Sequence, residues 1–232
     1  SAVWNGTDIP TSLRITAEIA IGGTFLPIII AALAGYAFAW LDFPGRDWLF
    51  IVVIGLLVPT VISHGTGHHR VNKIFGFTVN VVITIGMIVS IILLIRALPT
   101  HKESPTDLLL SATFLWLTNI MVFGLWYWRL DAGGPHGRDS RYGHPEGAFL
   151  FPQMTMTPET KTAADGHGWS PNFADYLFLA FNTSTAFSPT DVPVLARWAK
   201  FLVMLQSLIS LTVLVLLAAR AVNIFIQVQA MD

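Results

Sequence analysis

Long apolar stretches separated by short polar connections dominate the chain. A helix needs about 20 mostly apolar residues to cross the hydrocarbon core of a bilayer. Aromatic residues gather near the ends of such stretches, as they do at headgroup depth in membrane proteins. The pattern therefore predicts an all-α integral membrane bundle with five transmembrane helices. They are expected at about Ile15–Trp40, Trp48–Ser63, Ile74–Leu98, Leu108–Trp128 and Trp198–Ile226.

The character of the sequence changes after the fourth apolar segment. Residues 129–171 are rich in Gly, Pro, His and charged residues, and they show no helical period. This stretch is too polar for lipid and too long for a plain turn, so we expect a structured extramembrane loop. The sequence thus divides into a four-helix transmembrane region (1–128), the polar loop (129–171) and a C-terminal module (172–232).

The C-terminal module begins with an apolar stretch that is too short to span a bilayer. Residues 172–187 follow a Ser-Pro pair, which is a typical helix start, and run into the polar turn NTSTAFSPTD. Pro189 lacks a backbone donor and ends any helix there. Non-helical backbone at membrane depth is tolerated only inside protein or beside water. We therefore predict one re-entrant half-helix that returns to the surface by Pro193.

The order of elements in this module resembles the pore of tetrameric potassium channels. A short helix, a polar turn ending in Asp191 and a long final helix follow one another over about residues 170–226. The family's motif reads T-x-x-T-V-G-Y-G-D, and NTSTAFSPTD aligns with it through the aspartate. The helices before it, followed by WRLDAGGP, look like a family of uncharacterised bacterial membrane proteins. The resemblance implies a homotetramer in the bacterial inner membrane whose copies share a pore axis.

The turn departs from the channel motif at its most specific positions. Ser188 and Thr190 replace both filter glycines, and Pro189 lies between them. Glycine permits the positive φ angles that suit a ladder of backbone carbonyls, so that ladder is not expected here. Side chains would coordinate ions instead, which implies passive conduction of monovalent cations with weak or no potassium selectivity. The candidate ion-pathway residues are Thr183, Ser184, Thr185, Ser188, Thr190 and Asp191.

The same hydroxyl groups allow a second interpretation. Hydroxyls between membrane helices commonly form helix–helix hydrogen bonds worth about 1 kcal/mol or less. In that case nothing passes through the turn. The chain would then be a non-conducting structural subunit of a membrane complex that retains a channel-like fold.

A polar stripe on the final apolar segment bears on this choice. Gln206, Ser207 and Ser210 lie three to four positions apart and so share one helix face. Such a face indicates contact with water or with protein rather than with lipid. Asn182 is the half-helix residue that we expect to meet Gln206. All four are pore-lining candidates, and an interhelical contact stripe is the alternative.

Two asparagines are the deepest polar residues of the third and fourth segments. Asn80 and Asn119 both lie well inside apolar sequence. We expect each to form a helix–helix hydrogen bond, with a role in transport as the alternative.

Composition supports the membrane assignment and limits the partners. The chain is 53% hydrophobic and only 12% charged, whereas a soluble domain carries roughly a quarter charged residues. A net charge of −1 provides no basic surface for nucleic acid. The absence of cysteine excludes disulfides, thiolate metal sites and thiol catalysis. The expected partners are the lipid bilayer, further copies of the chain and a monovalent cation.

Motifs for catalysis are weak. DAGGPHG contains glycines but lacks the strand-to-helix setting of a phosphate loop, and no paired catalytic carboxylates are recognisable. His64 and His68 would share one face of a continuous helix, as metal ligands require, but Gly65 and Gly67 lie between them. We therefore predict no enzymatic activity and no cofactor, with a histidine–metal membrane enzyme as the contrasting hypothesis.

Overall fold

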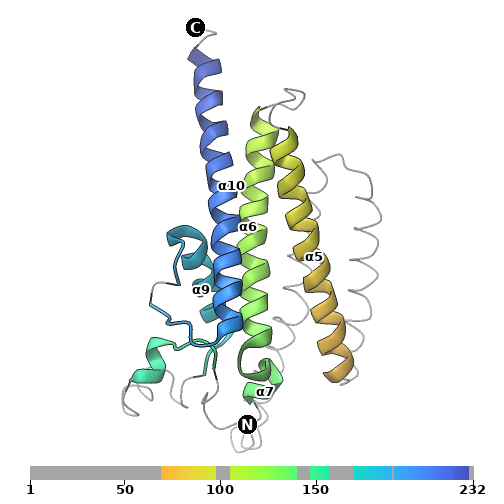
Figure 1. Ribbon diagram of the computed structural model, residues 1–232, viewed down its shortest axis with the longest axis vertical. Coiled ribbons are helices and arrows are strands. Elements are labelled where there is room, and N and C mark those ends of the chain that lie inside the picture. The colour runs from red at the N-terminus through yellow and green to blue at the C-terminus, as the bar shows by residue number, and fades with distance from the viewer. Residues whose placement is uncertain (1–68, 98–104, 140–146, 157–169, 190, 230–232) are drawn as a thin grey trace, which may run out of the picture.

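The structure is a computed structural model, and it describes residues 69–97, 105–139, 147–156, 170–189 and 191–229. These parts of the chain are helical apart from turns, connecting segments and one isolated β-bridge, which confirms the all-α prediction (Figure 1). The elements are α5 (His69–Ala97), α6 (Pro105–Leu130), η3 (Asp131–Gly133), α7 (Pro135–Asp139), η4 (Pro152–Thr155), α9 (Phe173–Ala186) and α10 (Arg197–Gln229).

Three of the described helices are long and apolar enough to cross a membrane. Their spanning stretches are Lys73–Arg96, Thr106–Gly133 and Arg197–Val222. These stretches confirm the third, fourth and fifth predicted segments to within a few residues. The first two predicted segments lie outside the described residues.

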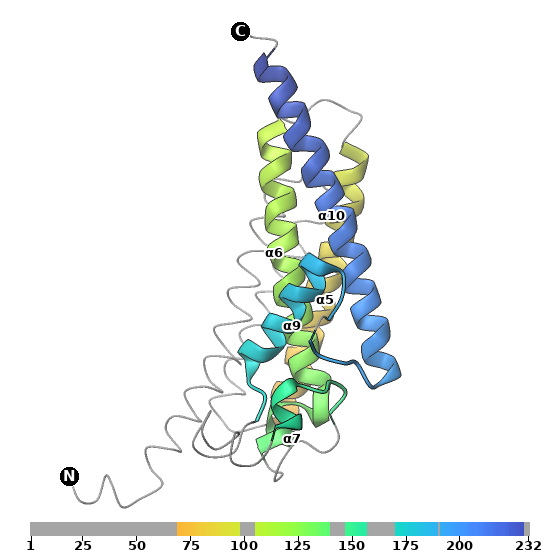
Figure 2. The ribbon, with the colours of Figure 1, turned by 90° about the vertical axis from the view of Figure 1, so that its left-hand side faces the viewer.

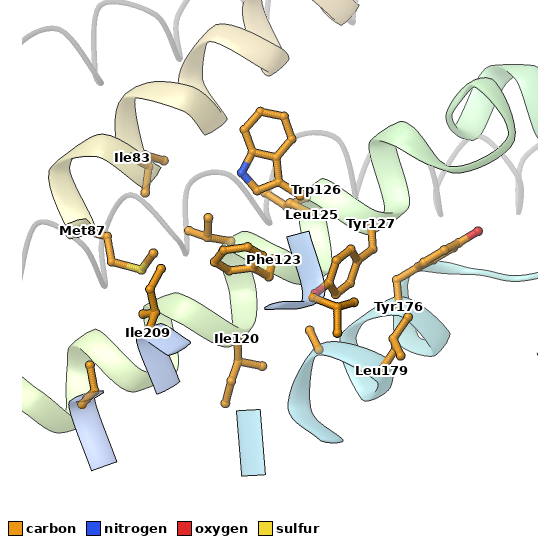
Figure 3. Close-up of a cluster of buried hydrophobic side chains, with 14 of the residues drawn as sticks. Ile83, Met87, Ile120, Phe123, Leu125, Trp126, Tyr127, Tyr176, Leu179 and Ile209 are labelled. Atoms are coloured by element: carbon orange, nitrogen blue, oxygen red, sulfur yellow. The ribbon is translucent and has the colours of Figure 1, made fainter. Parts of the chain in front are cut away.

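Helix α6 holds the described bundle together, because α5, α9 and α10 all pack against it. Figure 1 shows α6 between α5 and α10, with α9 beside the lower half of the bundle. Its residues Leu115, Val122 and Phe123 are fully buried, and α5 adds Ile83 and Met87 to the same core (Figure 3). The core therefore lies along α6.

The opposite side of α10 carries large apolar side chains that the rest of the described structure does not cover. Phe201 is 72% exposed, and Leu208 and Val215 are exposed on the same helix. Exposed apolar surface of this size is a liability in water but is normal against lipid tails or a partner helix. This face of α10 is therefore suited to the membrane interior.

Helix α9 has defined ends. At its start, the Asn172 side chain accepts hydrogen bonds from the backbone N–H groups of Ala174 and Asp175, while the Asp175 carboxylate accepts one from the Asn172 N–H. This reciprocal pair is a capping box. At its end, Phe187 adopts a left-handed conformation with φ 55°, and Pro189 follows. Pro189 is the predicted end signal, whereas the helix is capped by Asn172 and not by the Ser-Pro pair taken as its start signal from the sequence.

The segments that flank α9 meet at one end of the bundle. The Leu150 N–H donates to the Pro193 carbonyl at 3.0 Å, and the Leu195 N–H donates to the Ala148 carbonyl at 2.8 Å. These bonds join the segment before α9 to the segment after it. Figure 2 shows α9 rising from the α7 end beside α6, after which the chain returns to the start of α10.

Close packing of α9 on α6 generates a first prediction. A Cβ atom at Gly124 would lie 3.4 Å from the Leu177 Cα and 3.5 Å from its Cδ1, so alanine fits and a larger side chain does not. We expect Gly124→Ala to be nearly neutral and Gly124→Ile to reduce the free energy of unfolding by about 1–3 kcal/mol through overpacking. Thermal melting of the two detergent-purified variants measures this difference. Equal melting temperatures for the two variants would contradict the close contact.

Candidate functional site

A set of fully buried polar side chains lies where α6, α9 and α10 meet. We call it the polar seam. Because lipid offers no hydrogen-bond partners, polar groups at this depth must be satisfied within the protein. The polar seam consists of Asn119 and Tyr127 from α6, Ser184 from α9, and Gln206 and Ser210 from α10.

Ser210 joins all three helices in one half of the polar seam. The Asn119 Nδ2 donates to the Ser210 Oγ at 2.6 Å, and the Ser184 and Ser210 hydroxyls are 2.7 Å apart. A serine hydroxyl has one proton and two lone pairs, so it can serve two neighbours at once. The three helices are therefore linked by one small side chain.

Gln206 performs the same role one turn earlier on α10. Its Oε1 accepts a hydrogen bond from the Tyr127 hydroxyl, and its Nε2 donates to the Ala180 carbonyl of α9 at 2.7 Å. Figure 3 shows Tyr127 on the side of α6 that faces Tyr176 and Leu179. Both ends of the Gln206 amide are thus bonded to other helices.

A buried carboxylate ties the end of α6 to the polar loop. Asp131 is fully buried, and its two oxygens accept hydrogen bonds from the Tyr176 hydroxyl, at 2.6 Å, and from the Ala148 backbone N–H. Arg138 donates to the carbonyls of Trp128 and Asp131 at 2.8 and 2.9 Å, and its guanidinium lies 5.0 Å from the Tyr176 ring centre. Burial raises the pKa of the Tyr176 hydroxyl, so this group keeps its proton and remains a donor.

The candidate ion-pathway residues separate into two groups in the structure. Thr183 and Ser184 are fully buried, and the Thr183 hydroxyl donates to the Leu179 carbonyl at 2.8 Å. Thr185 is exposed, and its hydroxyl donates to the Phe181 carbonyl at 3.0 Å. Ser188 and Asp191 are also exposed, and Thr190 lies outside the described residues. The hydroxyls of the turn therefore do not form a single cluster.

The pore-lining candidates also occupy different surroundings. Gln206 and Ser210 are fully buried in the polar seam, while Ser207 and Asn182 are half-buried. Gln206 bonds to Tyr127 and to the Ala180 carbonyl rather than to Asn182, the partner expected from the sequence. For the two buried residues, the structure shows the interhelical contacts of the alternative interpretation.

Sequence analysis missed three members of this arrangement. Tyr127 belongs to an aromatic cluster that also fits a membrane interface, so its pairing with Gln206 was not predicted. Asp131 and Tyr176 are 45 positions apart, and neither lies in a recognisable motif. Their only sequence signal is an acid directly after a membrane helix, which is common in any loop.

The proposed histidine site cannot be placed, because His64 and His68 lie outside the described residues. Within the part of the chain that the structure describes, no group of three or more His, Cys, Asp or Glu side chains could hold a metal ion.

Comparisons with known proteins relate short segments of the chain to bacterial permeases. One segment is 46% identical over 56 residues to the alpha-glucoside transport system permease protein AglG of Rhizobium meliloti (strain 1021), covering 24% of this chain and 15% of that protein. A 40-residue match is 60% identical to the osmoprotective compounds uptake permease protein GgtD of Synechocystis sp., covering 17% of this chain and 13% of that protein. No protein-family model and no solved structure matches.

These findings confirm the predicted location. Three described helices are long and apolar enough to cross a membrane, and the matched relatives are bacterial permeases. The chain is an integral protein of the bacterial inner membrane.

The resemblance to tetrameric potassium channels is wrong. Two short segments of the chain match alpha-glucoside and osmoprotectant permeases, so the predictions of passive monovalent-cation conduction, of a cation partner and of a homotetramer are wrong as well. The resemblance misled because any helix that ends inside a membrane bundle needs a polar turn, whatever its function. The specific part of the motif, the two glycines, was already absent. In the structure, Phe187 rather than a glycine has the positive φ angle.

The polar seam generates a second prediction. Gln206→Leu would leave both the Tyr127 hydroxyl and the Ala180 carbonyl without their Gln206 partner. This change should reduce the free energy of unfolding by about 1–3 kcal/mol. The double variant Tyr127→Phe/Gln206→Leu should recover part of that loss, because no buried hydroxyl then remains unpaired. Thermal melting of the two single variants and of the double variant gives the coupling free energy between Tyr127 and Gln206. Strictly additive losses would contradict the hydrogen bond. Thr185→Ala, at an exposed position, is the control and should change stability by about 0.5 kcal/mol or less.

Proposed function

We propose that the chain is a membrane subunit of a bacterial solute-uptake system. The observation that carries this proposal is the similarity of two segments to uptake permeases. The proposed substrates are small polar solutes of the kinds in the relatives' names, alpha-glucosides and osmoprotective compounds. This function agrees with the second interpretation of the sequence, a subunit of a larger membrane complex.

The polar seam supports the same proposal. Its hydroxyl and amide groups bond α6, α9 and α10 to one another, so the three helices can move as one unit. The uncovered apolar side of α10 remains available to lipid or to another subunit. A transport subunit needs both properties, because it must change position within the membrane without losing its internal hydrogen bonds.

A solute-uptake experiment tests this function. Deletion of the gene from its source bacterium should reduce uptake of a labelled alpha-glucoside or of a labelled osmoprotectant, and the intact gene should restore it. Gln206→Leu should restore uptake only in part, because it loosens the polar seam, whereas Thr185→Ala should restore it fully. Unchanged uptake of both solute classes in the deletion strain would refute the proposal. Purified chain alone in liposomes should pass no monovalent cations.

The proposed topology is five transmembrane helices plus α9 as a re-entrant half-helix. The 14 residues of α9 reach about 21 Å at 1.5 Å per residue, which is less than the roughly 30 Å of a hydrocarbon core. The backbone bonds of Leu150 with Pro193 and of Leu195 with Ala148 hold the segment before α9 beside the segment after it, which supports this topology. In this topology the sequence divides as 1–128, 129–171 and 172–232.

Cysteine labelling tests the topology directly, because the chain has no native cysteine. Ser170 and Asp191 are exposed residues before and after α9, and Arg96 is exposed at the far end of α5. With single cysteines at these positions, a membrane-impermeant maleimide should label Ser170→Cys and Asp191→Cys from one side of the membrane and Arg96→Cys from the other. If Ser170→Cys and Asp191→Cys reacted from opposite sides, α9 would be a spanning helix and the proposed topology would be wrong.

A further inference from the structure

A second polar arrangement lies between α5 and α6, away from the polar seam. Arg129 is in the last turn of α6, and its side chain lies against Gly76 of α5. A Cβ atom at Gly76 would be only 2.0 Å from the Arg129 Nη1 and 2.6 Å from its Cζ. The guanidinium therefore occupies space that any other residue at position 76 would fill. Its Nε is buried and has no hydrogen-bond partner among the described residues.

Asn80 lies one helical turn from Gly76 on the same face of α5. It is 1% exposed, and neither its Nδ2 nor its Oδ1 has a hydrogen-bond partner within the part of the chain that the structure describes. A buried side-chain amide without partners costs about 1–3 kcal/mol for each unsatisfied group. The sequence predicted that Asn80 would form a helix–helix hydrogen bond, and no such bond is present in the described part of the bundle.

One turn further along α5, the polar residue Thr84 is hydrogen-bonded to α6. The Trp126 Nε1 donates to the Thr84 Oγ1 at 2.9 Å, and the Thr84 hydroxyl donates to the Asn80 backbone carbonyl at 2.6 Å. Phe77 packs edge-on against Trp126, with ring centres 5.0 Å apart. Asn80 thus lies between two contacts with α6, one to Arg129 through Gly76 and one to Trp126 through Thr84. The Arg129 Nε and the Asn80 amide are two of the buried polar groups without a hydrogen-bond partner among the described residues, and they belong to one stripe of the α5–α6 interface.

We propose that this stripe binds a phosphate ester that also carries hydroxyl groups, with phosphate on Arg129 and a hydroxyl group on Asn80. Guanidinium groups suit phosphate because they present parallel donors to its oxygens. The Asn80 amide offers one donor and one acceptor side, which matches a ligand with both a phosphate oxygen and a hydroxyl. A phosphoglycerol headgroup has this chemistry, and so does free glycerol phosphate.

Depth in the membrane favours the lipid source. Arg129 lies in the last turn of α6, near the end of the membrane-spanning stretch Thr106–Gly133. Phosphates of anionic lipids lie at this depth and attract basic side chains. A free arginine at such a site would normally extend to water, but the Nε of Arg129 is buried against α5 instead.

Lipid binding to the purified full-length chain tests the proposal. Native mass spectrometry in mild detergent measures lipid retained, with phosphatidylglycerol and phosphatidylcholine supplied at equal concentration. The wild type should retain phosphatidylglycerol about tenfold or more over phosphatidylcholine, and Arg129→Gln and Asn80→Leu should each reduce that preference by about tenfold. Arg197→Gln is the matched control, because Arg197 is an exposed arginine at the same end of the bundle, and it should leave the preference unchanged.

Thermal melting separates binding from a purely structural role. Asn80→Leu removes two unsatisfied groups, so without lipid this variant should melt at or above the wild-type temperature. Added phosphatidylglycerol should raise its melting temperature less than it raises that of the wild type. Glycerol phosphate alone is the probe for a soluble source: a rise in melting temperature with it and not with the lipid would assign the site to soluble phosphate esters. Equal retention of both lipids by the wild type, or an unchanged lipid preference in Arg129→Gln, would overturn the proposal.

Discussion

Hydrogen bonds among buried side chains of α6, α9 and α10 are the interaction on which the described structure depends. Apolar packing alone determines the positions of helices in a membrane only weakly, because lipid tails are as apolar as the helix faces. Buried polar groups determine how the helices are placed against one another, because a hydrogen bond forms only with a partner at a defined position. Ser210 and Gln206 each contact both α6 and α9, so they fix the depth at which the short helix sits on the bundle.

The polar loop extends the same principle to the end of the bundle. Asp131 is buried because Tyr176 and the Ala148 N–H satisfy its oxygens, and Arg138 binds the carbonyls beside it. The loop therefore closes over the base of α9 instead of standing free. Together with the backbone pairing of Leu150 with Pro193, this anchors both the entry to α9 and the exit from it.

Much of the described fold could be predicted from the sequence, and much of the site could not. The limits of α5, α6 and α10 follow from length and hydropathy, and the end of α9 follows from Pro189, whereas the Asn172 capping box at its start was not predicted. The role of the hydroxyl groups could not be predicted from the sequence, because serine and threonine are equally suited to lining a water-filled pore and to bonding helices together. Only the positions of Asn119 and Tyr127 on α6 decide that Ser184, Ser210 and Gln206 face protein. Partners so distant in sequence leave no local pattern.

The polar seam excludes water and holds α6, α9 and α10 together. Cysteine reactivity measures this most directly, since the chain has no cysteine of its own. In the membrane-embedded protein, Ser210→Cys and Ser184→Cys should react with a small water-soluble thiol reagent at least about a hundredfold more slowly than Ser170→Cys, which lies at an exposed position before α9. Reaction of Ser184→Cys and Ser210→Cys as fast as Ser170→Cys would show that water reaches the polar seam and would contradict this claim.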